Sequence, residues 1–133
     1  MDEQIFLKLA KQELFEIVTA IEAVIDRSDV DCDVADRDGV VELGFEDGSK
    51  IVLNLHLAMQ EIWLAARSGA YHFRPSHGGW FDTRGESSLR AVLAQALQMH
   101  SAGVLALEAQ WIAQGGVAAL GSSVAESPGK CSS

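Results

Sequence analysis

Acidic side chains gather where the first predicted helix meets the first predicted strand. Asp29, Asp31 and Asp33 alternate with apolar residues, which puts all three on one face of a strand. Glu22 and Asp26 lie one helical turn apart in the preceding segment. Such side chains offer only oxygen ligands, which suit hard cations and high-spin iron better than zinc or copper. The pattern is typical either of a weak cation site without one fixed geometry or of a solvated acidic surface.

The turn predicted at residues 36–39 extends this acidic surface. It pairs the flanking strands so that Val34 faces Val41 on the buried side. The same register sets carboxylates opposite each other on the solvent side: Asp33 with Glu42, and Asp29 with Glu46. Like charges in such positions destabilise a sheet. We therefore expect the surface either to tolerate a small loss of stability or to bind something cationic.

Trp63 is the second residue whose position points to binding. Ile62 and Leu64 share one face of a predicted strand, and Trp63 lies on the other. If the helices cover the Ile62 face, the indole stays on the open side of the sheet, where an exposed Trp is a typical anchor for a protein partner. The alternative is that a loop or the C-terminal segment covers it.

Histidine and cysteine spacing predicts no zinc site, and no catalytic motif is recognisable. His72 lies on the outward side of a strand, His56 and His77 fall in predicted loops, and Cys32 is expected in the core. His100 ends the second predicted helix, where a cation would suit the helix dipole. The chain has no nucleophile elbow, phosphate loop or dinucleotide fingerprint. The residues therefore indicate binding rather than a recognisable chemical step.

Apolar periodicity predicts two helices separated by short strands. The first helix covers residues 4–26, and the second begins after Ser87 or Ser88 and runs to about His100. The predicted strands are 29–34, 40–45, 50–55, 60–66, 70–74 and 80–83. We predict an α+β fold, a two-layer sandwich with the N- and C-terminal helices packed on one face of an antiparallel sheet. The domain spans residues 1–113, and residues 114–133 are predicted to be a disordered tail.

The length and net charge of the chain limit the kinds of protein it can be. The chain has 133 residues, which suits one domain, and a formal net charge of −9, with all the excess negative charge in residues 1–50. Charge of this sign argues against non-specific binding to nucleic acid or anionic membranes. No apolar run is long enough to span a bilayer, and the acidic start differs from a signal peptide. We expect a cytoplasmic protein whose cysteines stay reduced.

Several collinear blocks resemble the frataxin family, and its bacterial CyaY type most closely. They are residues 48–54 (GSKIVLN), 62–65 (IWLA), 69–73 (GAYHF) and the pattern Trp80-x-Asp82-x-Arg84. The likeness covers roughly residues 5–103. It implies an iron-binding accessory protein of iron–sulfur cluster assembly that contacts the cysteine desulfurase and the cluster scaffold protein. Its role would be to donate iron, to regulate the desulfurase, or both.

The resemblance also assigns residues to these roles. By position, it implies ferrous or ferric iron on surface carboxylates: Glu22, Asp26, Asp29, Asp31 and Asp33. It implies that Trp63, with Asn54 nearby, faces the scaffold, and we place Glu42 and Glu46 in the partner-binding surface as well. No catalytic residue is assigned. The protein is expected to be a monomer or an iron-dependent oligomer.

Departures from the family pattern keep two alternatives open. Val18 and Thr19 stand where the family leads us to expect carboxylates. One alternative is an enzyme of the same fold that oxidises ferrous iron, although no Glu-x-x-His di-iron pattern is present. The other is a diverged binding module with the docking surfaces and little or no iron affinity.

Overall fold

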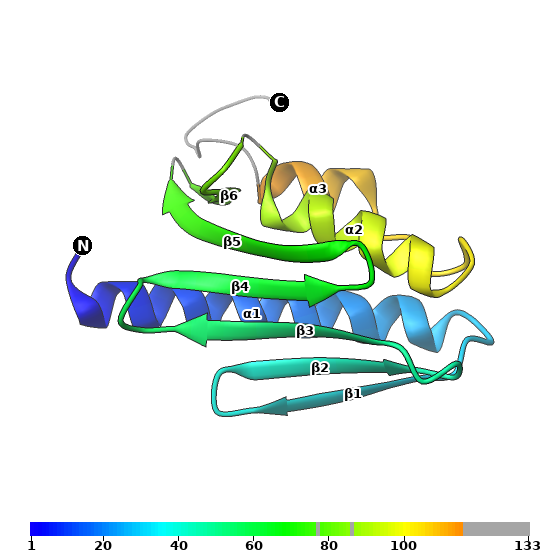
Figure 1. Cartoon of the computed structure of the whole chain (residues 1–133). Coiled ribbons are helices and arrows are strands. Elements are labelled where there is room, and N and C mark those ends of the chain that lie inside the picture. Colours follow the sequence, from blue (N-terminus) through cyan, green and yellow to red (C-terminus); the bar gives the residue numbers. More distant parts are fainter. Residues whose placement is uncertain (77, 86, 116–133) are drawn as a thin grey trace.

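The computed structural model describes residues 1–76, 78–85 and 87–115 and shows one sheet with its helices on one side (Figure 1). Six strands form an antiparallel meander in the order of the chain. The elements are α1 (Glu3–Asp26), β1 (Cys32–Arg37), β2 (Val40–Phe45), β3 (Lys50–His56), β4 (Glu61–Ala66), β5 (Gly69–Ser76), β6 (Gly79–Asp82), α2 (Leu89–His100) and α3 (Ala109–Gln114).

Helix α1 forms over the predicted segment and buries one apolar stripe of it. The Asp2 carboxylate caps it by accepting hydrogen bonds from the backbone N–H groups of Gln4 and Ile5, at 2.7 and 3.4 Å. Its buried apolar residues recur at three- and four-residue steps: Phe6, Ala10, Leu14, Ile17, Ile21 and Val24. This stripe faces the sheet, and the exposed side carries Phe15 among its polar residues.

The first hairpin has a different register from the one predicted. Asp38 and Gly39 both have positive φ, 52° and 81°, so they form a two-residue turn whose twist suits an antiparallel pair. The strands then pair Val34 with Leu43, two positions away from the predicted partner Val41. The predicted buried side is kept because a shift of two residues preserves the alternation of faces. The prediction failed because it placed the centre of the turn one residue too early.

Strand boundaries also differ from the predicted ones, by up to three residues. Strand β1 begins at Cys32, so Asp29 and Asp31 precede it and, of these three aspartates, only Asp33 lies within the strand. Strand β5 continues through Ser76, two residues beyond the predicted end at residue 74. His56 is the last residue of β3 rather than part of the following loop. His77 lies outside the described residues, as does the tail from residue 116 onward.

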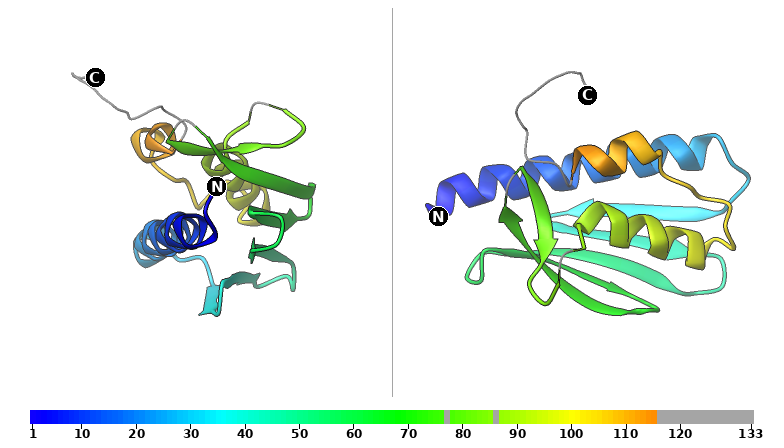
Figure 2. Two further views of the ribbon diagram at one scale, coloured as in Figure 1. Left: turned by 90° about the vertical axis from the view of Figure 1, so that its left-hand side faces the viewer. Right: turned by 90° about the horizontal axis from the view of Figure 1, so that it is seen from above.

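Figure 2 shows the two layers, a sheet and the helices beside it. One apolar core lies between them. Helices α1 and α2 cover one face of the sheet, and no helix among the described residues covers the other face. The largest fully buried side chains come from both layers: Phe6, Phe73, Ile17, Ile21, Leu43, Ile51, Leu53, Ile62, Leu64, Leu89, Leu93 and Leu97. The predicted α+β sandwich is therefore confirmed. No described helix is long and apolar enough to cross a membrane.

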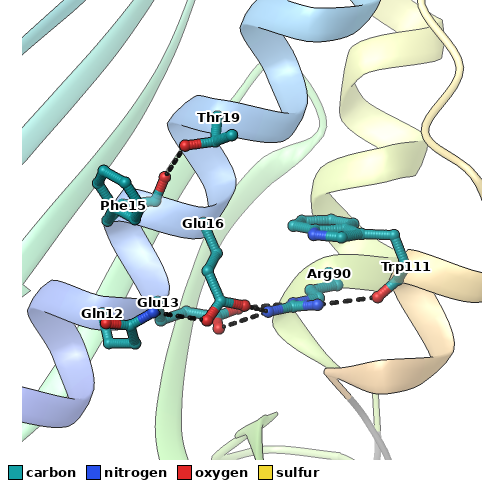
Figure 3. Close-up of polar contacts among 7 residues, drawn as sticks. All are labelled: Gln12, Glu13, Phe15, Glu16, Thr19, Arg90 and Trp111. Carbon is teal, nitrogen blue, oxygen red and sulfur yellow. Dashed lines mark hydrogen bonds and ion pairs between the residues drawn. The ribbon is translucent and has the colours of Figure 1, made fainter.

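A buried ion-pair network connects α3 with α1 and α2 (Figure 3). Arg90 in α2 donates from Nε and Nη2 to the two carboxylate oxygens of Glu13, both at 3.0 Å, and from Nη2 to Glu16 at 2.6 Å. Its Nη1 donates to the carbonyl of Trp111 at 2.9 Å, and its guanidinium lies 4.1 Å from that indole. The network therefore packs α3 against α1 and α2, and Leu105 and Leu107 of the preceding segment are buried in the core.

Candidate functional site

Trp63 lies on the helix-free face of the sheet, as its parity predicts. Its neighbours Ile62 and Leu64 are almost fully buried toward the helices, at 0% and 1% exposed. Strand pairing places Trp63 directly between Asn54 of β3 and His72 of β5. The predicted pair of Trp63 and Asn54 is therefore adjacent across two strands.

Two histidines sandwich the Trp63 indole. The His56 ring lies 3.6 Å from it, centroid to centroid, at an interplanar angle of 15°. The His72 ring lies 4.1 Å away on the other side, at 5°. Flat contact on both faces leaves the indole half-buried, so it offers a partner its edge rather than its open faces. This corrects the expectation of an uncovered indole, because neighbouring side chains on the same sheet face cover it.

Glu61 holds the Trp63 indole of this stack through its carboxylate. One carboxylate oxygen accepts a hydrogen bond from Trp63 Nε1 at 2.7 Å, and the other accepts one from Arg74 Nε at 2.9 Å. His72 Nδ1 lies 3.6 Å from the oxygen that binds the indole. Glu61 is only 2% exposed although the face it belongs to carries no helix. We define the Trp63 surface as Asn54, His56, Glu61, Trp63, His72 and Arg74.

Sequence reasoning missed the roles of Glu61, His56 and Arg74. Parity puts Glu61 on the face of Trp63, and Arg74 on the face of His72. The available signal was an acid and a base on neighbouring strands. Glu61 lies two residues before Trp63, Arg74 lies two residues after His72, and both rings point outward. What parity cannot show is that one carboxylate reaches both the indole and the guanidinium.

The carboxylates predicted to bind iron lie at another place, where α1 leads into β1. All five, Glu22, Asp26, Asp29, Asp31 and Asp33, are exposed, and none of them forms a hydrogen bond or ion pair with other described residues. Asp29 and Asp31 line a hollow of about 440 Å³ together with Glu46 and Asp47. The other three predicted ligands are not part of its lining. We call the five carboxylates and Glu46 the acidic edge.

The donor set of the acidic edge suits a hard cation held loosely. Every donor is a carboxylate oxygen, which is a ligand that ferrous and ferric ions bind. The donors do not converge, however. Within residues 1–76, 78–85 and 87–115, no three His, Cys, Asp or Glu side chains are grouped closely enough to hold a metal ion. This arrangement fits a hydrated ion attracted by several charges better than one bound by an ordered inner shell.

Glu42 and Glu46 do not take the positions predicted for them. Asp33 faces Gly44, and Glu42 faces Ala35 on one side and Val52 on the other, so the expected pairs of opposed carboxylates do not form. Instead, Glu42 accepts a hydrogen bond from Lys50 Nζ at 3.3 Å. Glu46 is exposed in the turn between β2 and β3.

His100 takes part in a polar hydrogen-bond network beside the acidic hollow. Its Nε2 accepts the backbone N–H of Arg67 at 3.1 Å, so Nδ1 carries the proton and donates to Ser49 Oγ at 2.9 Å. Ser49 in turn donates to Asp47 at 2.6 Å. Burial, followed by the charge of Arg67, lowers the pKa of His100. The expected cation at the end of α2 is therefore a neutral imidazole, because its second nitrogen is needed as an acceptor.

Asp47 is the strongly acidic member of this network. Hydrogen bonds from Ser49 hydroxyl and backbone, followed by Arg67, lower the pKa of Asp47 to about 2. Arg67 Nη2 lies 2.7 Å from its second oxygen. The carboxylate therefore stays ionised at physiological pH, and its charge is paired with that of Arg67.

Comparison with known proteins places this chain in a family. The profile of the frataxin-like domain matches residues 1–103, which is most of the chain. The chain belongs to the frataxin-like family. It is 41% identical over 108 residues to the iron-sulfur cluster assembly protein CyaY of Cupriavidus metallidurans, an alignment that covers 81% of this chain and 97% of that protein. It is 45% identical over 94 residues to the protein of the same name from Cupriavidus taiwanensis, covering 71% and 85%.

Solved structures agree with the family. The frataxin of Psychromonas ingrahamii superimposes with a TM-score of 0.66 at 25% identity, covering 80% of this chain and 97% of that one. A trimeric frataxin from Saccharomyces cerevisiae, complexed with ferrous iron, shares the fold with a TM-score of 0.63 at 22% identity, covering 77% and 88%. Residues 104–115, which include α3, lie beyond the family match.

Proposed function

We propose that this protein is an iron-binding accessory factor of iron–sulfur cluster assembly that acts on the complex of cysteine desulfurase and cluster scaffold. The observation that carries the proposal is the Trp63 surface, an aromatic and charged patch on a sheet face that no described helix covers. Relatives about 40% identical over four-fifths of the chain are named iron-sulfur cluster assembly proteins. We place its action in the cytoplasm.

The Trp63 surface is proposed to dock the scaffold protein. Trp and Arg are among the residues that most often dominate binding energy at interfaces, and both occur in this patch. The indole is already held in one orientation, which reduces the ordering needed on association. Asn54, the cross-strand partner of Trp63, adds an amide that can form hydrogen bonds.

The acidic edge is proposed to attract cations. Its carboxylates can hold hydrated ferrous iron as cargo, or they can meet a basic patch on the desulfurase. Both uses depend on long-range charge, because no described side chain neutralises the five predicted carboxylates. Iron held this way would exchange readily, which suits a donor better than a store.

One observation favours a second candidate, a binding module with little iron affinity. The described acidic side chains do not form a group of three able to hold a metal. In that case the acidic edge serves only as an electrostatic contact, and the protein regulates the desulfurase without carrying iron.

Reconstituted cluster formation tests the proposal. Scaffold, desulfurase, cysteine and ferrous iron are mixed with and without this protein, and cluster absorbance is followed over time. We expect the protein to change the initial rate at stoichiometric concentration, and Trp63→Ala to remove most of that effect. A rate unaffected by the protein at any iron concentration would contradict the proposed function. Equal effects of wild type and the Asp29→Asn/Asp31→Asn/Asp33→Asn variant would mean that these carboxylates neither hold iron nor make the electrostatic contact that the second candidate assigns to them.

A further inference from the structure

Glu61 is an unusual residue for its place in the fold. Glutamate side chains are rarely buried unless they are paired. This one is 2% exposed on the sheet face that no described helix covers, and the groups around it belong to the Trp63 surface itself. A carboxylate enclosed by a surface patch costs solvation energy, which its contacts must offset.

The contacts of Glu61 divide between its two oxygens. One binds the indole N–H of Trp63, and the other binds the guanidinium of Arg74. Hydrogen bonds to an ionised carboxylate are stronger than neutral ones. Because each oxygen has its own donor, the carboxylate cannot rotate without losing both bonds, and the indole it holds is fixed in turn.

The direction of the indole decides whether the stack exists. Trp63 donates to a residue two positions earlier on the same strand, so its ring leans along β4 toward Glu61. Glu61 in β4 pairs with His56 in β3, whereas Trp63 in β4 pairs with His72 in β5. Leaning toward Glu61 therefore brings the indole alongside His56 while it keeps contact with His72. A different rotamer would separate the three rings.

We infer that Glu61 is a positioning residue: its buried carboxylate fixes the Trp63 indole between His56 and His72 and so pre-organises the docking surface. The inference rests on the proposed function for the identity of the partner, but the contact itself can be tested on the isolated protein. Pre-organisation predicts that loss of the carboxylate weakens docking even though Glu61 is too buried to form much of the contact itself.

The first test is nuclear magnetic resonance of the indole N–H groups in the isolated protein. In the wild type, we expect the Nε1 proton of Trp63 to be shifted downfield and protected from exchange with water. In Glu61→Ala, the shift and the protection should both be lost. Glu61→Gln retains one acceptor oxygen and should keep most of the protection. The Nε1 signal of Trp80, which is buried in the core, is the internal reference for intact folding.

The second test is binding to the scaffold protein by calorimetry. Glu61→Ala should weaken binding roughly fivefold, and Glu61→Gln by about twofold or less, because one ordered side chain is freed in the first variant and largely kept in the second. Glu108→Gln, which changes an exposed carboxylate remote from this surface, is the matched control and should bind like the wild type. If Glu61→Gln binds the scaffold nearly as well as the wild type, the hydrogen bond to the indole matters for docking rather than the buried charge itself.

Each outcome decides one part of the inference. An indole N–H signal unchanged in Glu61→Ala would overturn the contact. A changed signal with unchanged scaffold affinity would overturn the role in docking, provided that Trp63→Ala does weaken binding. If Trp63→Ala also binds like the wild type, the proposed docking role of this face fails and the affinity claim for Glu61 fails with it, whereas the resonance test still decides the contact.

Discussion

Among individual residues, Trp63 and His100 show how neighbours change what a side chain offers. Parity predicted that Trp63 and His72 would point outward, and both do. It could not show that two imidazoles stack on the indole, since that depends on rotamers and not on spacing. His100 was expected as a cation from its place at a helix end, but its two nitrogens make different hydrogen bonds that only the folded structure reveals.

Replacing Trp63 tests the docking surface at the scale of one residue. Trp63→Ala should weaken scaffold binding by about 2 kcal/mol or more, as for a central interface tryptophan, and leave the protein folded. Trp63→Phe keeps a ring between the histidines without the N–H donor and should bind with intermediate affinity. Calorimetry with circular dichroism as the folding control makes the measurement. Wild-type affinity in Trp63→Ala would remove this residue from the mechanism.

His100 predicts how stability changes with pH. Its pKa is lowered in the folded protein, so between that value and about 6.5 the unfolded chain binds more protons than the native state. The free energy of unfolding should therefore be highest above pH 6.5 and decrease as the pH falls below it, with a slope from this group of at most about 1.4 kcal/mol per pH unit.

Urea unfolding between pH 7.5 and 5.5 measures this effect. The variant His100→Gln cannot titrate and should show a flatter dependence over the same range. Parallel profiles for wild type and variant would mean that His100 is free to protonate in the folded state. That result would also contradict the hydrogen bond from the Arg67 backbone N–H to its Nε2.

At the scale of elements, local patterns predicted the helices and strands better than their pairing. Apolar periodicity located both long helices and the alternation of each strand, since those signals lie within the segment itself. Register depends on which two residues form the turn, and Asp38 and Gly39 were not recognised as a pair with positive φ. That shift of two positions removed every predicted pair of opposed carboxylates in the first hairpin.

The carboxylates before and within β1 allow a prediction about neutralising them. Asp29, Asp31 and Asp33 have no described hydrogen-bond or ion-pair partner, so their replacement by Asn removes only mutual repulsion. The triple variant should have an unchanged or slightly higher melting temperature, measured by calorimetric scanning. A melting temperature lowered by more than about 4 °C, or about 1 kcal/mol for a domain of this size, would mean that these carboxylates are structurally paired.

Arg90 predicts how much α3 adds to the fold. Arg90→Met leaves the buried Glu13 carboxylate without its partner and frees the Trp111 carbonyl, so it should lower the free energy of unfolding by about 3–5 kcal/mol. Adding Glu13→Gln to this variant should restore part of the loss, because the unpaired charge is then gone. Urea unfolding gives both values. A loss below about 1 kcal/mol would contradict the role of this network in holding α3.

At the scale of the whole molecule, the fold separates two surfaces of different chemistry. The acidic hollow lies at the end of the sheet where α1 leads into β1 and β2 turns into β3, whereas His56 closes the other end of β3 (Figure 1). The Trp63 surface occupies the open face toward that second end. Such separation allows one partner to contact the open face while the acidic edge meets a cation or a basic surface.

The sequence was sufficient for the layers of this molecule but not for its network of side chains. Each apolar stripe needs a partner surface, and few arrangements bury all of them, so the sandwich followed from the stripes. The links from Glu61 to Arg74 and from Arg90 to Trp111 join residues whose spacing carries no such signal. They depend on the final geometry of long, flexible side chains.

Binding to the organism's cysteine desulfurase tests the central claim most directly. The protein is titrated into the desulfurase by calorimetry, without iron and then with anaerobic ferrous iron, at low and high salt. We predict binding that weakens clearly as salt increases, because the acidic edge supplies an electrostatic contact. A change in affinity on adding iron would support the role as iron carrier, and unchanged affinity would support the iron-independent module. Absence of binding in all four conditions would contradict the proposed place of this protein in iron–sulfur cluster assembly.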